Sequence, residues 1–443
     1  MDSPLESFAY PISIPNENIP LWDGEFEYYT PDVHKTTGKV FARMLPSPDV
    51  RIEFEGNIGI GIDDVFERRE KLRLGSIGAL LSRGRTRLDS ISHYNNEEGD
   101  IFNHCKGDLT LDLSNEQIEC DKVVFHIPNY IDNYPSELRL TDNTWEIVSV
   151  KVSNYKDIKE KIESTAGFGI THLGILRRLD GATFKASDAE TILIKLYWFL
   201  SFARGSVCGP MLYIGSLNNI KTWEPWNVPL QHPWKKGTHG WMSSKNSTIN
   251  ETAINQAFQG FIRKSTDDYW RPCLFQAIHW YTEVNRSTIV LEGAIALLQL
   301  DLELISWAIL EETSPDKTKF ESFDKMKAHE KIRDTLKRLS IPTDIDGIPL
   351  LNQYLDEIIT DDTPKDGPTA ITSLRNAIVH PRKNKRSKIE SAGNEVKYAA
   401  RAVGLNYILL ALLKIIGYNG KYLNHNSWNE EPVPWSRGLD SKR

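Results

Sequence analysis

Short runs in which apolar and polar residues alternate fill the chain from about residue 38 to about residue 150, and β-branched or aromatic residues are frequent in them. Turn residues such as Pro46-Ser47-Pro48-Asp49 separate the runs. Five runs are predicted to be strands: Gly38–Met44, Val50–Phe54, Leu109–Leu113, Lys122–Ile127 and Trp145–Val152. The pattern predicts an antiparallel β-rich N-terminal domain, either a sandwich or a barrel.

From about residue 250 the apolar positions recur with the period of an α-helix. Gly367 and Pro368 occupy the positions that glycine and proline favour at a helix start, the N-cap and N1. The predicted helices, one of them ahead of this region, are Asp188–Arg204, Ser287–Glu312, Lys325–Leu339, Pro368–Val379 and Val396–Ile416. An all-α bundle at the C-terminus follows, and the fold class is α+β multidomain.

The segment from about Gly205 to Asn250 is predicted to connect these parts. It contains several prolines and glycines, the pair Lys235-Lys236 and four tryptophans: Trp223, Trp226, Trp234 and Trp241. Tryptophans beside lysines can stack on nucleotide bases, or they can pin an irregular segment onto a neighbouring domain. The pattern favours the second role. The expected domains are residues 1–186, a connector with one helix at 187–265, and a helical bundle at 266–443.

The charge, the cysteines and the apolar runs of the chain each exclude a class of protein. There are 53 Lys and Arg against 60 Asp and Glu, a net charge of −7, so a protein that coats nucleic acid through bulk positive charge is excluded, whereas a local basic site is not. The four cysteines form no CxxC pair, and we expect neither a zinc site nor a cofactor. No signal peptide is visible, and the apolar runs Ile192–Ala203 and Gly404–Tyr418 are shorter than a membrane span of about 20 residues. A cytoplasmic protein is expected.

Cys208 and a run of alternating arginines can each be interpreted either as structural or as functional residues. Cys208 lies in a glycine-rich turn with no nearby histidine, which favours a packed thiol over a nucleophile. Arg83, Arg85 and Arg87 alternate, so on a strand they would share one face and form either a phosphate site or a solvated face. No paired carboxylates or activated nucleophile mark the N-terminal domain as an enzyme.

The strongest chemical group is Arg375, Asn376 and His380, near the end of a predicted helix. Arginine offers a fork of donors to a phosphate, and histidine can accept or donate a proton near pH 7. Five basic residues follow without an acidic one, and could hold RNA locally: Arg382, Lys383, Lys385, Arg386 and Lys388. Metal-free RNA cleavage needs these parts: a base, a cation beside the phosphate and an acid. A helix-ending histidine beside a surface arginine is the alternative.

The Arg-Asn-x3-His group, late in a helical bundle, resembles the Arg-x4–6-His motif of HEPN-superfamily nucleases over about Pro272–Asn424. The β-rich region followed by Leu196–Gly205 resembles, in layout, the N-terminal part of ApeA-like HEPN proteins of anti-phage defence. The resemblance implies a metal-independent endoribonuclease that acts as an abortive-infection toxin, with tRNA one candidate substrate and a phage-derived trigger at the N-terminal domain. The alternative is a non-catalytic HEPN module that binds RNA, nucleotide or a protein partner.

Helix geometry adds a prediction about assembly. Five residues along a helix separate Arg375 and His380 by about 7.5 Å in rise and about 140° in azimuth, so they do not readily converge on one phosphate. Pro381 disfavours the α conformation of His380, which re-aims the ring at the helix end. Two copies related by a twofold axis would supply one histidine as base and the other as acid. A homodimer with a composite site is therefore expected, in agreement with the usual arrangement of the family.

Overall fold

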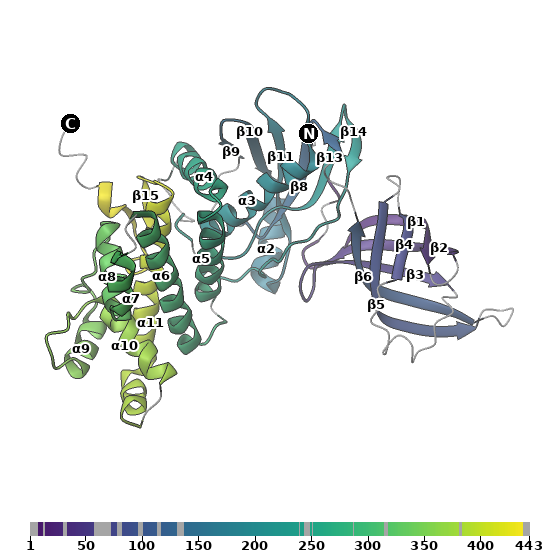
Figure 1. Ribbon diagram of the computed structural model, residues 1–443. Coiled ribbons are helices and arrows are strands. Elements are labelled where there is room, and N and C mark those ends of the chain that lie inside the picture. Colours follow the sequence, from purple (N-terminus) through teal and green to yellow (C-terminus); the bar gives the residue numbers. More distant parts are fainter. Residues whose placement is uncertain are drawn as a thin grey trace. The chain divides into compact units, whose positions relative to one another are not determined.

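The computed structural model describes most of the chain (Figure 1). The described residues are 8–11, 14–29, 33–56, 72–77, 82–95, 101–112, 117–130, 137–238, 240–242, 249, 251–286, 288–313, 318–380 and 383–436. Contacts within the chain divide it into two compact units. The first comprises Met1–Tyr197 and Cys208–Lys236, and the second comprises Trp198–Val207 and Gly237–Arg443.

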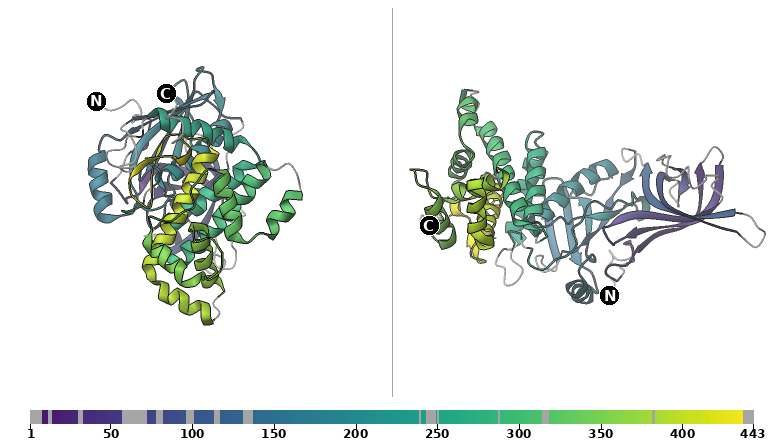
Figure 2. Two further views of the ribbon diagram at one scale, coloured as in Figure 1. Left: turned by 90° about the vertical axis from the view of Figure 1, so that its left-hand side faces the viewer. Right: turned by 90° about the horizontal axis from the view of Figure 1, so that it is seen from below.

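The first unit begins with a closed antiparallel barrel, whose strands are drawn in purple and blue in Figure 2. Its strands follow the order β1-β2-β3-β6-β5-β4, so two three-stranded meanders join along both edges. Their bounds are β1 Ile19–Tyr29, β2 Val33–Arg43, β3 Asp49–Gly56, β4 Leu72–Ile77, β5 Ser82–Asn95 and β6 Ile101–Asp112. Closure leaves no open sheet edge. The prediction of an antiparallel β-rich N-terminal region is confirmed.

Apolar side chains at alternate positions along the strands are buried inside the barrel. Phe26, Val40, Ile52 and Phe54 are buried, whereas their neighbours along the strands are more exposed. On the wall, Arg51 is buried and donates to the carboxylates of Asp89 and Asp108, which ties β3 to β5 and β6.

The alternating arginines lie on β5, as a strand interpretation requires. In the backbone register of the sheet, these arginines lie opposite residues of β6: Arg83 opposite Asp112, Arg85 opposite Thr110 and Arg87 opposite Asp108. Arg87 is exposed, which suits a solvated face, while the side chains of Arg83 and Arg85 lie outside the described residues.

A six-stranded antiparallel sheet completes the first unit, in the order β14-β13-β8-β11-β10-β9. Its strands are β8 Lys122–Pro128, β9 Glu137–Thr141, β10 Trp145–Lys151, β11 Ile170–Arg178, β13 Met211–Leu217 and β14 Ile220–Trp223. A short pair, β7 Glu119–Cys120 and β12 Phe184–Lys185, and the helix α2, Tyr155–Thr165, accompany it. The expected connector at 187–265 therefore contributes two strands to this sheet. The first four residues of β13, Met211–Ile214, form a short buried apolar run. Such a run lacks the alternation by which a sequence indicates a strand.

The tryptophans of this segment pack inside the protein. Trp223 and Trp241 are fully buried, Trp226 is 7% exposed, and Trp234 is half-buried. The base-stacking role is therefore wrong for Trp223, Trp226 and Trp241, whose rings are packed in the interior. Cys208 is also buried, as expected of a packed thiol.

The second unit is built of helices. The helix α3, Ala186–Arg204, contributes its last turns, in which Phe199 contacts Phe258 and Phe261. The helices that follow are α4 Glu251–Thr266, α5 Trp270–Asn285, α6 Leu291–Thr313, α7 Thr318–Lys325, α8 Ala328–Arg338, α9 Pro349–Ile358, α10 Gly367–Val379 and α11 Lys383–Ile415. The chain ends with β15 Lys421–Leu423, β16 Glu430–Pro432 and a 3-10 turn, Pro434–Ser436. Helix α6 packs against α5, α8, α10 and α11, so the predicted C-terminal helices are confirmed.

Two of these helices are long and apolar enough to cross a membrane by composition alone. They are Leu291–Glu312 and Gly393–Ile415, and the structure buries 61% and 72% of their apolar windows. Gly393–Ile415 overlaps the apolar run Gly404–Tyr418, whereas Leu291–Glu312 is a separate segment from the run Ile192–Ala203. Burial by neighbouring helices accounts for their composition without a membrane.

Asp301 is an unusual member of this core. Its side chain, on α6, is completely buried, and neither carboxylate oxygen has a hydrogen-bond partner among the described residues. Burial raises the pKa of this carboxyl well above its usual value. The folded protein therefore holds a proton that the unfolded chain releases above about pH 4, and stability falls as the pH rises through that window.

Asp301→Asn should therefore stabilise the protein at pH 8 by about 1–3 kcal/mol, because it removes a buried group that must remain protonated. At pH 4.5 the gain should be close to zero. Urea unfolding at the two pH values measures it, with Asp268→Asn on an exposed turn as control. A gain of equal size at both pH values would show that Asp301 does not titrate in this way.

Candidate functional site

The helix α10 carries the predicted site, and its start is fixed by Asp366. The Asp366 carboxylate accepts a hydrogen bond from the main-chain N–H of Thr369 at 3.0 Å, the arrangement of an N-cap. Asp366, not Gly367 as expected, is therefore the capping residue, because its extended backbone and side-chain acceptor satisfy a free helix amide. Pro368 remains within the first turn, where it costs no hydrogen bond.

Two helices hold this cap in place. Arg333 of α8 donates from Nε and Nη2 to the two oxygens of Asp366, at 2.5 and 3.0 Å, and from Nη2 to the Thr369 hydroxyl at 2.9 Å. Tyr407 of α11 packs on Gly367, where a Cβ atom would lie 2.0 Å from the tyrosine hydroxyl. Glycine is therefore required for close approach at this position. The sequence analysis did not single out Arg333 or Tyr407.

Arg375 and Asn376 lie near the end of α10, and both side chains are half-buried. Nη1 of Arg375 donates to Oδ1 of Asn376 at 3.3 Å. Within the described part of the chain no carboxylate pairs with Arg375, whose guanidinium carries five N–H donors. This bond joins the two neighbouring side chains near the end of α10.

His380 is the first residue beyond α10 and is exposed. Its backbone leaves the helical region, with φ −119° and ψ 71°, while its N–H still donates to the carbonyl oxygen of Asn376 at 3.0 Å. The departure that Pro381 predicts is thus present, and the ring is placed at the helix end. Nothing in the described residues joins the side chains of Arg375 and His380 by a hydrogen bond.

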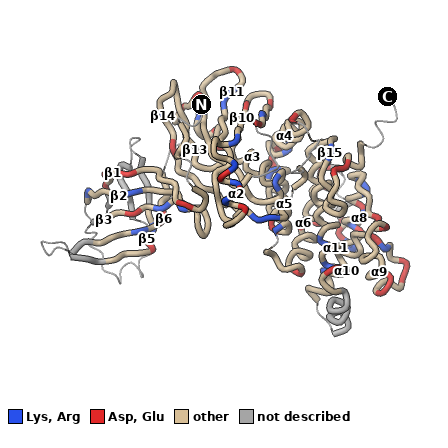
Figure 3. The backbone as a smooth tube through the Cα atoms, turned by 180° about the vertical axis from the view of Figure 1, so that it is seen from behind, with Lys and Arg blue, Asp and Glu red and all other residues tan. Residues whose placement is uncertain are grey.

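The basic segment after His380 has a helical backbone from Lys383, because α11 begins there. Gly393, with φ 67° and ψ 174°, interrupts α11 and separates this first part from the long buried part. Arg382 lies outside the described residues, and so do the side chains of Lys383, Lys385, Arg386 and Lys388. The acidic residues Asp356, Glu357, Asp361 and Asp362 lie at the end of α9 and just after it (Figure 3), where Lys365 contacts Asp356 at 2.6 Å.

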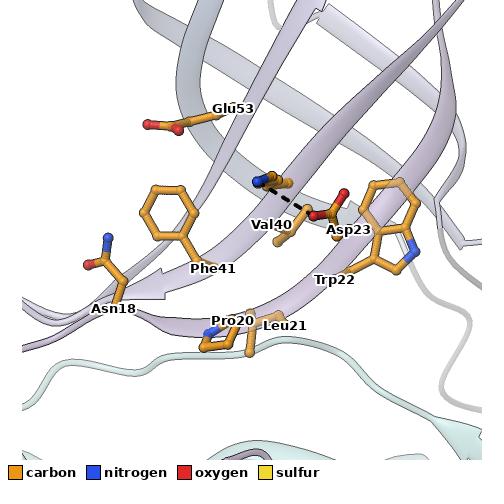
Figure 4. Close-up of a pocket in the computed structure, with 9 residues that line it drawn as sticks. Asn18, Pro20, Leu21, Trp22, Asp23, Val40, Phe41 and Glu53 are labelled. Atoms are coloured by element: carbon orange, nitrogen blue, oxygen red, sulfur yellow. Dashed lines mark ion pairs between the residues drawn. The ribbon is translucent and has the colours of Figure 1, made fainter. Parts of the chain in front are cut away.

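A pocket of about 480 Å³ lies elsewhere, on the barrel (Figure 4). Nine residues line it: Asn18, Pro20, Leu21, Trp22, Asp23, Lys39, Val40, Phe41 and Glu53. Its charges are paired locally, since Lys39 lies 3.7 Å from Asp23, and Glu53 lies 2.8 Å from Lys106. The pocket thus combines the rings of Trp22 and Phe41 with charges that are paired to neighbouring residues. As for metals, the described residues contain no group of three or more His, Cys, Asp or Glu that could hold an ion.

Two family models match the chain. The YopA central domain matches residues 115–237, and the YopA C-terminal domain matches residues 267–433, which include α10. The SPbeta prophage-derived uncharacterized protein YopA of Bacillus subtilis (strain 168) is 26% identical over 427 residues, which cover 92% of each chain. No solved structure matches. The similarity extends over both units of the chain.

Proposed function

We propose that this protein is a metal-independent endoribonuclease that acts as an abortive-infection effector, with tRNA one candidate substrate. The observation that carries the proposal is the end of α10. There, Arg375 has no carboxylate partner among the described residues and is hydrogen-bonded to Asn376, and His380 is exposed where the helix breaks off. An uncompensated guanidinium suits a phosphate, and an exposed imidazole suits proton transfer.

The chemistry needs no cofactor. A histidine removes the proton of the 2′-hydroxyl, and the resulting oxygen attacks the adjacent phosphorus. Arg375 stabilises the charge of the pentacoordinate phosphate. The bond from phosphorus to the 5′-oxygen breaks, a second acid protonates that oxygen, and the products are a 2′,3′-cyclic phosphate and a 5′-hydroxyl. The five basic residues from Arg382 to Lys388 hold the RNA backbone.

A homodimer supplies both the base and the acid. One His380 cannot easily perform both proton transfers on opposite sides of one phosphate, whereas a second copy across a twofold axis contributes another. Sedimentation equilibrium should therefore give twice the mass of the chain. A monomer that cleaves RNA would exclude the composite site.

The cellular setting is the cytoplasm, where RNA is available to the enzyme. The N-terminal barrel, with its pocket beside Trp22 and Phe41, would take a phage-derived trigger. The B. subtilis protein with similar sequence is named as derived from a prophage, which fits a role in conflict between phages and their hosts.

His380→Ala and Arg375→Ala should each lower RNA cleavage by about a hundredfold or more, because each removes a proton-transfer group or the charge on the phosphate. The assay incubates the purified full chain with total RNA in EDTA and detects fragments that end in 2′,3′-cyclic phosphate. Circular dichroism should show unchanged folding. Arg338→Ala, an exposed arginine of α8, is the matched control and should retain activity.

A non-catalytic binding module is the second candidate, favoured by the lack of any hydrogen bond between Arg375 and His380 in the described structure. It predicts RNA, nucleotide or protein binding with no cleavage. Activity that survives both alanine substitutions, or that requires a metal ion, would overturn the proposed mechanism.

A further inference from the structure

Arg401 on α11 is a half-buried cation to which no described residue offers a carboxylate. Its Nε donates to the main-chain oxygen of Val284 at 2.9 Å, near the end of α5. Burial lowers the pKa of its guanidinium, as expected for a charge that is neither solvated nor paired. Among the described residues the bond to Val284 is the hydrogen bond that Arg401 makes, so its two terminal nitrogens carry N–H groups that can donate to an anion.

The neighbouring carboxylates are already occupied by other cations. Glu283, beside Val284, contacts Nη1 of Arg286 at 3.0 Å. Glu292, in the first turn of α6, contacts Nζ of Lys397 at 2.6 Å, and Lys397 lies one turn before Arg401. Three cations therefore meet two carboxylates where α5, α6 and α11 come together. The uncompensated charge belongs to Arg401.

An exposed aromatic ring lies on the same helix. Tyr398 is 58% exposed and precedes Arg401 by three residues, a spacing that brings side chains together on a helix. A ring available to solvent beside a fixed guanidinium is the combination that binds a nucleotide base and its phosphate.

This pair lies along the same stretch of the bundle as the candidate site. Helices α10 and α11 pack together, and Gly367 at the start of α10 lies against Tyr407 of α11. Tyr398 and Arg401 precede Tyr407 on α11 by nine and six residues, about 13 and 9 Å along the helix axis.

We propose that Arg401 and Tyr398 form a subsite for single-stranded RNA, in which Arg401 binds a phosphate away from the scissile bond and Tyr398 stacks on an adjacent base. This subsite rests on the proposed ribonuclease function and explains how the strand is held on α11. A purely structural Arg401 would serve only to cap the end of α5, for which its single bond to Val284 suffices.

The experiment measures RNA binding by the full-length chain in a His380→Ala background, which prevents cleavage. Fluorescence anisotropy with a labelled single-stranded RNA oligonucleotide is recorded at several salt concentrations. Arg401→Gln should weaken binding about tenfold and reduce the salt slope by about 0.7, the loss of one phosphate contact on a single strand. Tyr398→Ala should weaken binding about tenfold with little change in slope, and Tyr398→Phe should bind like the parent.

Arg338→Gln, an exposed arginine of α8 paired with Asp334, is the matched control. A salt slope unchanged by Arg401→Gln would overturn the subsite while leaving the ribonuclease proposal intact, whether or not thermal stability falls. An arm with a labelled mononucleotide tests the other source of a base and phosphate: tight mononucleotide binding without RNA binding would also overturn it. Failure of the parent to bind RNA, together with absence of cleavage by the wild type, would remove both proposals.

Discussion

Replacing Arg333 with methionine should lower the free energy of unfolding of the helical unit by about 3–5 kcal/mol, because it leaves the carboxylate of Asp366 buried without its cation. The side chains of Arg333 and Asp366 are only 12% and 10% exposed. Arg333 also donates to Thr369, so the substitution removes three hydrogen bonds at the start of α10. The helix that carries Arg375 and His380 would lose its anchor.

A double-mutant cycle tests this prediction. Arg333→Met, Asp366→Asn and the double variant are compared by urea unfolding, and the double variant should lose less than the sum of the single ones. The control is Arg338→Met, which breaks the exposed pair with Asp334 and should cost no more than about 1 kcal/mol. Equal losses at positions 333 and 338 would contradict the argument from burial.

Acidification from pH 7.5 to pH 5 should destabilise the first unit by about 2 kcal/mol for each of two buried histidines, His126 and His172. Nε2 of His126 accepts from the N–H of Tyr10 at 3.2 Å, and its Nδ1 lies 3.1 Å from the oxygen of Leu212, to which it donates. Only the neutral ring satisfies both partners, since a protonated Nε2 would face an N–H group.

Burial lowers the pKa of both rings. That of His126 falls to about 4, and that of His172, enclosed by the rings of Tyr130 and Tyr155 with Lys151 nearby, falls to about 3. The unfolded chain takes up these protons near its ordinary value of about 6.5, and the folded chain does not. The unfolded state therefore binds more protons as the pH falls below 6.5, and stability is lost down to the folded pKa.

The measurement is urea unfolding at several pH values between 5 and 7.5. His126→Asn and His172→Phe should each reduce the slope of stability against pH by about one proton, even where they lower stability at pH 7.5. His34→Asn on the half-exposed strand β2 serves as the control. Unchanged slopes in both buried variants would show that other groups govern the acid response.

Much of the architecture followed from local patterns. The predicted strand Gly38–Met44 covers the second half of β2, which begins at Val33, and Trp145–Val152 corresponds closely to β10. The helical period of Pro368–Val379 corresponds to α10, because each pattern reflects one buried face. The strand β13 was not recognised, since a short buried run has no alternation to reveal it. The predicted N-cap of α10, Gly367, is one residue later than the observed one, Asp366. Aspartate and glycine both suit this position, so the sequence alone does not choose between two adjacent candidates.

The sequence by itself determined the α+β class, the helix that bears Arg375 and Asn376, and the departure of His380 from helical geometry, since all three depend on residues close together in the chain. Only the tertiary structure decided which charges remain uncompensated. Arg333 meets Asp366 from another helix, whereas Arg375 and Arg401 meet no described carboxylate, although all three are arginines on helices. Charge compensation depends on contacts between distant segments, and desolvation depends on burial by them, so neither can be read from local spacing.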